Sequence, residues 1–301
     1  LLMKLSQLSE EKLLDELLRG IRDGKDVVVG PGDDCAAVRV SGSSGLLLLK
    51  TDCVVENVHF SSALSGARVG RKALCRALSD IAAMGGLPSH AMITIFSPPE
   101  IPVAYWKSVY RGLMAAAKKY HVAIVGGETT SAPVRAISVA LTGLVSPRHL
   151  VRRSGGRDGD VLYVTGRLGG SLRRKHWAFE PRLNEGRWLA DHGFARAMMD
   201  LSDGLAKDLP RLAAASGTGF HISPAAIPRS NGVSFEAAVS DGEDYELLFA
   251  VRAPDVERLE SSWRKQFPKL MLTPIGFLCE KGKAFRFDQS GFDHFRGKES
   301  R

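Results

Sequence analysis

The sequence predicts a mixed α/β protein with two domains. The chain has 301 residues, which is enough for two domains of ordinary size. Short apolar runs typical of strands alternate with segments of helical periodicity in both halves. Residues 146–160 are polar, basic and contain glycine, as a linker does. We therefore expect a first domain at residues 1–146 and a second at residues 147–301.

The first half is expected to contain three helices and six strands. The first helix has leucines at 13, 14, 17 and 18, with Ser9 as a candidate N-cap and Gly20 as a candidate stop. The expected helices are residues 10–19, 68–84 and 103–120. The expected strands are residues 27–29, 36–40, 46–50, 91–96, 122–125 and 136–145.

The second half repeats this alternation without a convincing sequence repeat. Its expected strands are residues 161–165, 220–222, 246–251, 272–277 and 284–287. Its expected helices are residues 205–215, 234–239 and 254–267.

Composition favours a soluble globular protein of the cytoplasm. Hydrophobic residues are 44% and charged residues 25% of the chain, as in ordinary globular proteins. No run reaches the ~18 apolar residues of a membrane span, and the first residues are too short for a secretory apolar region. Cys35, Cys53, Cys75 and Cys279 show no CxxC spacing, so neither a disulfide framework nor a zinc site is expected.

The formal net charge of +8 has two interpretations, nucleic acid or small anionic substrates. Aromatic residues are only 7% of the chain and do not interleave with the basic clusters as a base-stacking platform would. We therefore favour small anionic substrates, with neither a nucleic acid nor a membrane as partner.

Clustered carboxylates follow strand-like runs at several distant points of the chain. Such acids would repel one another unless a cation neutralised them, and Mg²⁺ prefers carboxylate oxygen. Asp80 lies inside an apolar helix, where an ionised acid needs a metal or a salt bridge, and we favour the metal. These observations predict a metal–phosphate site built from loops. The four segments in which carboxylates follow a strand-like run are residues 30–34 (GPGDD), 51–52 (TD), 126–130 (GGETT) and 200–204 (DLSDG).

Each segment also has a simpler interpretation. Residues 30–34 also suit a plain turn, Asp203 suits a helix cap, and residues 241–246 suit a solubilising loop. His59 is either structural or a contact for an anion. Ser202 and free backbone N–H groups at the following helix start could meet phosphate. Neither a Walker nor a Rossmann glycine pattern is present.

Together these segments resemble the thiamine-monophosphate kinases, of the ATP-utilising family that includes aminoimidazole ribonucleotide synthetase and selenophosphate synthetase. The runs MDLSDGL and GEDYELLF and the pair Thr51-Asp52 followed by Val-His-Phe60 carry the resemblance to the kinase branch. The similar stretches span almost the whole chain in order. They are residues 30–60, 70–88, 124–133, 153–166, 199–217 and 242–249.

The resemblance implies a two-domain aminoimidazole ribonucleotide synthetase-like fold and a homodimer in which the N-terminal sheets close a barrel. ATP would lie between the domains and phosphorylate thiamine monophosphate to thiamine diphosphate by direct in-line transfer, with no covalent nucleophile. The resemblance assigns residues in three groups. Mg²⁺ would be held by Asp34, Thr51, Asp52, Asp80, Glu128, Asp200 and Asp203; ATP by Gly127, Arg153 and Ser202; and thiamine monophosphate by His59, Glu243 and Phe292.

Two departures from the kinase pattern stand out. Glu128 replaces the usual aspartate, as it does in the synthetase branch, and about one helix is missing after Gly169. Two alternatives therefore stay open: another ATP-dependent branch of the family, or a non-catalytic nucleotide-binding relative. Turnover of thiamine monophosphate would distinguish them.

Overall fold

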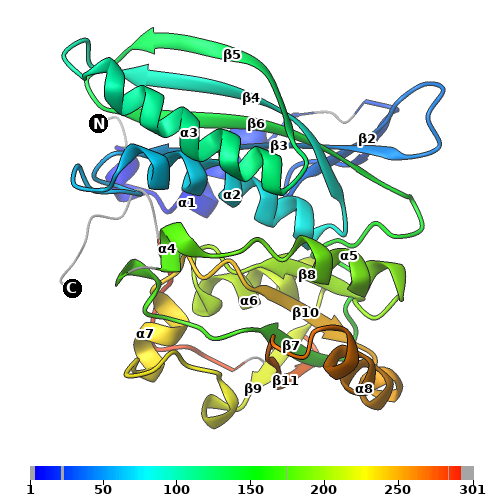
Figure 1. The fold of residues 1–301 in the computed structure, drawn as a ribbon. Helices are drawn as coiled ribbons and strands as arrows, with labels where there is room; N and C mark the ends of the chain where they lie inside the picture. Colours follow the sequence, from blue (N-terminus) through cyan, green and yellow to red (C-terminus); the bar gives the residue numbers. More distant parts are fainter. Residues whose placement is uncertain (1–3, 22–23, 174, 284, 293–301) are drawn as a thin grey trace.

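The computed structural model describes residues 4–21, 24–173, 175–283 and 285–292. They form two layers, each built on one antiparallel or mixed β-sheet (Figure 1). Among the described residues, no helix is long and apolar enough to cross a membrane.

The first sheet has six strands in the order β1-β2-β3-β6-β4-β5. Neighbouring strands are antiparallel except for the parallel pair β4 and β5. The strands are β1 (Val27–Val29), β2 (Ala36–Arg39), β3 (Leu46–Val55), β4 (Leu87–Ser97), β5 (Ala123–Ser131) and β6 (Ala136–Val145).

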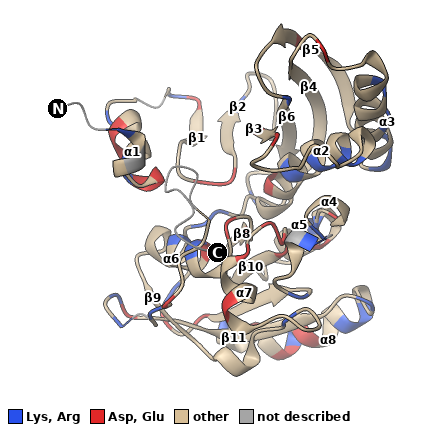
Figure 2. Cartoon of the chain, turned by 90° about the vertical axis from the view of Figure 1, so that its left-hand side faces the viewer, with Lys and Arg blue, Asp and Glu red and all other residues tan. Residues whose placement is uncertain are grey.

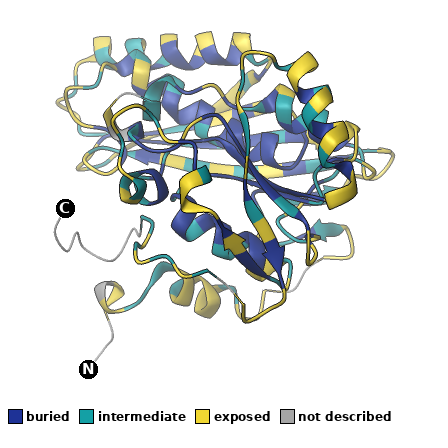
Figure 3. Cartoon of the chain, turned by 90° about the horizontal axis from the view of Figure 1, so that it is seen from below, coloured by how far each residue is buried: buried dark blue, intermediate teal, exposed yellow. Residues whose placement is uncertain are grey.

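Two helices, α2 (Gly66–Ala83) and α3 (Val103–Lys119), pack together in the first layer (Figure 1). The peripheral helix α1 (Glu10–Leu18) forms ion pairs with the second layer, from Glu10 to Lys207 and from Glu11 to Arg211. Glycine permits the close approach of α2 and α3. A Cβ on Gly70 would lie 2.1 Å from the Val109 carbonyl oxygen, and one on Gly112 would lie 1.9 Å from that of Ala67. Because α2 also contacts the second layer, most of it is buried. Figure 3 shows buried residues in the interior of the molecule and exposed ones along its outer helices and loops.

Several large apolar side chains of the first sheet remain exposed. In β3, Leu48 and Val54 are fully buried while Leu49 is 40% exposed, as the period of two in a strand requires. Met92 of β4 and Val125 of β5 are 52% and 59% exposed. The described strands do not close into a barrel, since β1 and β5 are the two edges.

The second sheet has five antiparallel strands in the order β8-β10-β7-β11-β9. The strands are β7 (Val161–Thr165), β8 (Ala197–Asp200), β9 (Gly219–Ile222), β10 (Leu247–Val251) and β11 (Leu272–Cys279). The helices are α4 (Lys175–Ala178), α5 (Leu183–Asp191), α6 (Leu205–Ala215), α7 (Phe235–Ser240) and α8 (Val256–Gln266). Short 3₁₀ turns are η1 (Leu5–Gln7), η2 (Ser171–Arg173), η3 (Pro224–Ala226) and η4 (Ala253–Asp255).

The expected elements of the first half are all present, whereas the second half differs at four places. Strand β8 and the helices α4 and α5 were not predicted. The sequence of β8 is AMMD, which has no strand propensity, and the segment is extended because it pairs with β10. The strand expected at 284–287 was wrong for residues 285–287, and residue 284 lies outside the described residues.

Candidate functional site

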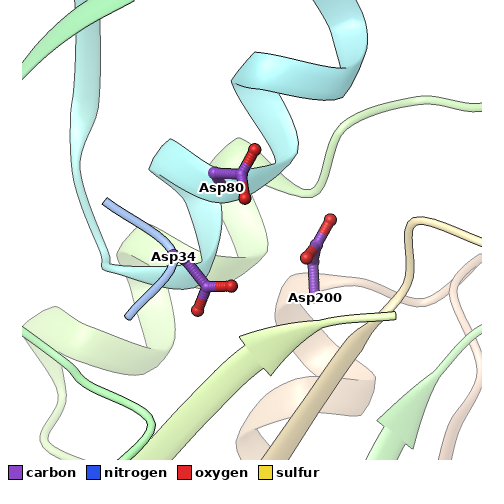
Figure 4. Close-up of side chains that lie close together, drawn as sticks. All are labelled: Asp34, Asp80 and Asp200. Atoms are coloured by element: carbon purple, nitrogen blue, oxygen red, sulfur yellow. The ribbon is translucent and has the colours of Figure 1, made fainter. Parts of the chain in front are cut away.

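Three of the predicted carboxylates meet between the two layers. Asp34 follows the turn after β1, Asp80 lies near the end of α2, and Asp200 ends β8. One carboxylate oxygen from each lies within 4.8 Å of the others, and Figure 4 shows the three side chains pointing toward one another. Their exposed fractions are 2%, 6% and 2%. We call Asp34, Asp80 and Asp200 the acidic centre.

The acidic centre carries more negative charge than the chain neutralises. Burial raises the pKa of Asp80 well above its ordinary value, against the effect of Lys50. Burial and the charge of Asp34 also raise the pKa of Asp200. Oδ2 of Asp34 is buried without a hydrogen-bond partner among the described residues. Since carboxylate oxygens are the ligands that Mg²⁺ prefers, this donor set fits a divalent cation.

Arg153 is tied to the acidic centre by the two acids of the first turn. Its Nη2 donates to Asp34 Oδ1 at 2.7 Å, and its backbone N–H donates to both carboxylate oxygens of Asp33 at 3.2 Å. Burial, then the charge of Asp34, raises the pKa of Asp33 to about 6. Asp33 was absent from the predicted site residues. Its position beside Asp34 was the available signal. In Figure 2, both acidic and basic residues of the first layer face the second layer.

Asp52 lies beside the acidic centre but is paired with an arginine side chain. Oδ2 of Asp52 accepts from Arg76 Nε at 3.1 Å, and the charge of Asp52 is close enough to contribute to the raised pKa of Asp80. Thr51 is exposed on the opposite face of β3.

Glu128 and Asp203 are not among the carboxylates that the structure gathers. Glu128 is exposed on β5, an edge strand, and accepts from the N–H of Thr129. Asp203 pairs with Arg211 at 2.6 Å and with Lys207 at 3.1 Å. The metal roles predicted for Thr51, Glu128 and Asp203 therefore stay predictions.

The backbone N–H groups before α6 are not free, contrary to expectation. The N–H groups of Ser202, Asp203 and Gly204 all donate to Oδ2 of Asp208, at 3.0, 3.0 and 3.1 Å. Asp208 is fully buried and lies in the first turn of α6, so it satisfies donors that a helix start leaves unpaired. A phosphate contact at Ser202 would then have to use its side chain.

Gly127 has a structural reason to be glycine. A Cβ there would lie 1.8 Å from the carbonyl oxygen of Ile93 on the paired strand β4. Its predicted contact with ATP is a separate matter and stays a prediction.

Two of the three predicted substrate residues share a partner, Lys72. Its Nζ, on a fully buried side chain, lies 2.7 Å from Glu243 Oε1 and also donates to the carbonyl oxygen of His59. Phe292 lies elsewhere: its N–H donates to the carbonyl oxygen of Asp203 at 3.0 Å, and its own carbonyl accepts from Lys207. His59 also accepts from the N–H of Val55 through Nδ1.

The surroundings of Lys72 contain further residues that the sequence analysis missed. His176 of α4 lies 2.9 Å from Lys72 Nζ, and Arg76 lies 3.6 Å from Glu243. Burial lowers the pKa of Lys72 to about 8. Burial, then Lys72, lowers the pKa of His176 to about 4. The signal in the sequence was spacing: residues 72, 76 and 80 are four apart on α2, and so share one helix face.

The segment after Gly169 packs against α2. Arg71 donates to the carbonyl oxygen of Trp177 at 3.0 Å, and the guanidinium of Arg68 lies 4.0 Å from the Trp177 ring centroid. The rings of Phe179 and Tyr245 stack with centroids 4.0 Å apart. The short α4 therefore connects the two layers at the side of the Lys72 cluster.

The comparisons with known proteins agree with one another. Residues 32–145 match the family described as AIR synthase related protein, N-terminal domain. The thiamine-monophosphate kinase of Rhodopirellula baltica is 37% identical over 272 residues, which are 84% of this chain and 85% of the relative. That of Escherichia coli K12 is 31% identical, covering 90% and 93%.

Solved structures extend the similarity to three dimensions. AaThiL complexed with AMPPCP and TMP matches with a TM-score of 0.84 and 30% identity, over 97% of this chain and 99% of that chain.

Proposed function

The chain belongs to the thiamine-monophosphate kinase family, and we propose that its reaction takes place at the acidic centre between the two layers. The enzyme uses ATP to phosphorylate thiamine monophosphate to thiamine diphosphate. The observation that carries the choice of site is the convergence of Asp34 and Asp80 from the first layer with Asp200 from the second.

We infer that each predicted domain contributes to this site. Residues 1–146 would provide metal and ATP binding and the dimer interface, and residues 147–301 would complete the ATP and substrate site. The division is supported by the two sheets, whose strands lie on either side of the 146–160 linker.

Mg²⁺ is the proposed resident cation, held by Asp34, Asp80 and Asp200, with Asp52 next to them. When bound, it would neutralise the phosphoryl oxygens of ATP. The buried, unpaired Oδ2 of Asp34 and the raised pKa values of the other two carboxyls support this assignment.

The protein's own groups position the two phosphates. Arg153, held by Asp33, would orient ATP from the second layer, and its guanidinium can bind phosphate oxygens in a bidentate manner. Lys72 fixes both His59 and Glu243, so it would set the position of the thiamine monophosphate contacts. The acceptor is already an ionised phosphate, so it needs no general base.

Direct in-line transfer is the proposed mechanism. It predicts inversion at the γ-phosphorus of chiral, isotopically labelled ATP. Net retention would instead require two displacements and a covalent intermediate, and would contradict the mechanism.

A homodimer is proposed from the uncovered face of the first sheet. A groove on this face is lined by Leu49, Met92 and Val125 among others, and apolar surface of this kind favours burial against a partner. A second copy is the occupant that the family resemblance implies. Thr51 lies on the same face, and Glu128 lies on the edge strand β5, so a partner could bring both closer to an active site. Light scattering would measure the mass, and Met92→Glu should shift it to that of a monomer.

The function is tested by following ADP release with thiamine monophosphate as acceptor. Turnover should require Mg²⁺ and yield thiamine diphosphate, and unphosphorylated thiamine is the matched control that should give none. ATP binding without turnover would support a non-catalytic relative. ATP use with a different acceptor would support another branch of the family.

A further inference from the structure

Lys50 places a positive charge inside the acidic centre. Its Nζ lies 2.7 Å from Oδ1 of Asp80. Lys50 belongs to β3 and shares a strand face with Asp52, two residues on. That face packs against α2, on which Asp80 lies.

The position of Lys50 is built into the fold, because its side chain is only 22% exposed and that of Asp80 only 9%. Burial opposes the charge on Lys50, but Asp80 and Asp52 together outweigh this effect and raise the pKa of Lys50, so the ammonium stays charged. The ammonium of lysine is a compact point charge, which makes it comparable to a bound cation.

The acidic centre is thus already partly neutralised by the chain itself. Asp34 pairs with Arg153 at 2.7 Å and Asp80 pairs with Lys50 at 2.7 Å. Asp200 forms no ion pair within the described part of the chain. With all five groups ionised, three carboxylates and two cations leave a formal charge of −1, which a single divalent ion more than offsets.

We propose that the Lys50 ammonium takes one cation position of the acidic centre, so that the nucleotide-free protein holds one divalent ion there instead of two. The inference rests on the proposed metal site and deepens it. The single ion would use Asp200, the free oxygen of Asp34 and the oxygen of Asp80 that Lys50 does not contact. A second ion at Asp80 would lie next to the ammonium and be repelled by it.

The test is direct metal binding to the nucleotide-free full-length chain. Free Mn²⁺, measured by electron paramagnetic resonance, gives the number of bound ions, and Mg²⁺ calorimetry gives the affinity. The wild type should bind one ion per chain. K50S, which removes the charge and opens space at Asp80, should bind two, or bind the first at least about tenfold more tightly.

Two matched controls separate this effect from general charge removal. K50R keeps a positive charge at the same position and should bind one ion, as the wild type does. K107S removes an exposed lysine of α3 and should also bind one. If K50S does not fold without metal, the count for the wild type still decides, because two or more ions bound to the wild type overturn the proposal.

The remaining outcomes are distinguishable. If K50S binds the same number of ions as the wild type, with an affinity within threefold, Lys50 does not have the proposed role. The metal site itself then still stands, provided that D200N weakens Mn²⁺ binding. If neither the wild type nor K50S binds Mn²⁺, the metal site itself is wrong and the inference falls with it. If K50S loses ATP affinity with no change in ion count, Lys50 is a phosphate contact and the proposal is contradicted.

Discussion

Asp200 and Glu246 are two carboxylates with the same burial and opposite surroundings. Each is 2% exposed, and Asp200 pairs across the sheet with Leu247, the residue after Glu246. Burial alone would raise the pKa of Glu246, but Lys175 and Arg182 lower it. Asp200 makes no ion pair among the described residues, and its pKa is raised.

The difference lies in the partners that the fold supplies. Glu246 receives two bonds from Arg182, at 2.7 and 2.8 Å, one from the Thr165 hydroxyl at 2.8 Å, and an ion pair with Lys175 at 3.0 Å. A saturated buried carboxylate holds structure together, whereas an under-partnered one beside two other acids needs a ligand. The same residue chemistry therefore serves stability at one strand end and function at the next.

The largest effect should come from D200N. Removing a proposed metal ligand should lower kcat about 10²- to 10³-fold, a loss typical of removing one electrostatic contact to the reacting phosphoryl group. The free energy of unfolding without metal should stay within about 1 kcal/mol or rise, because repulsion in the acidic centre is relieved.

Steady-state kinetics and urea unfolding of D200N measure these two quantities. The control is D158N, which changes an exposed acid and should alter neither. Near-normal turnover of D200N at saturating Mg²⁺ would remove Asp200 from the site.

E246Q should show the reverse pattern. It leaves Arg182 and Lys175 without their buried anion, which should cost about 3–5 kcal/mol of unfolding free energy. Turnover per folded molecule should change little. Urea unfolding at 25 °C measures the loss, with E257Q on the exposed side of α8 as control. A loss no larger than that of the control would mean that the ion pairs around Glu246 contribute nothing to stability.

The pH dependence of the unfolding free energy extends the comparison to a second pair of buried carboxyls, Asp244 and Glu246. Its pKa is raised from 3.8 to about 7, mainly by burial. Between those values the folded state binds more protons than the unfolded state, so stability falls as pH rises. The pKa of Glu246 is lowered from 4.5, so its contribution is present above pH 4.5 and is lost as pH falls below that value.

Unfolding free energies of the wild type, D244N and E246Q at several pH values separate the two residues. The unfolding free energy of the wild type minus that of D244N should decrease from pH 4 to pH 7. The difference between wild type and E246Q should decrease only in acid. Parallel curves for D244N and wild type would show that Asp244 titrates normally.

The sequence predicts the three carboxylates of the acidic centre, but it does not predict which cations neutralise them. Asp34 and Asp200 stand at strand ends and Asp80 interrupts an apolar helix face, which are local signals. The partners Lys50 and Arg153 are 30 and 119 residues away from the acids that they pair with, so only tertiary packing reveals them. The same holds for β8, which is a strand because β10 pairs with it.

D203N should have a small effect on the free energy of unfolding, and the sign of this effect tests whether Asp203 belongs to the acidic centre. From the clustering of acids along the chain, loss of this charge would be neutral or stabilising. The structure instead pairs Asp203 with Arg211 and Lys207, and these cations lower its pKa against the effect of burial. D203N should therefore lose about 1 kcal/mol of unfolding free energy at pH 7, while K207M should lose a similar amount and the double variant less than the sum. If D203N is instead more stable than the wild type without metal, Asp203 belongs electrostatically with Asp34, Asp80 and Asp200, and the site extends to the start of α6.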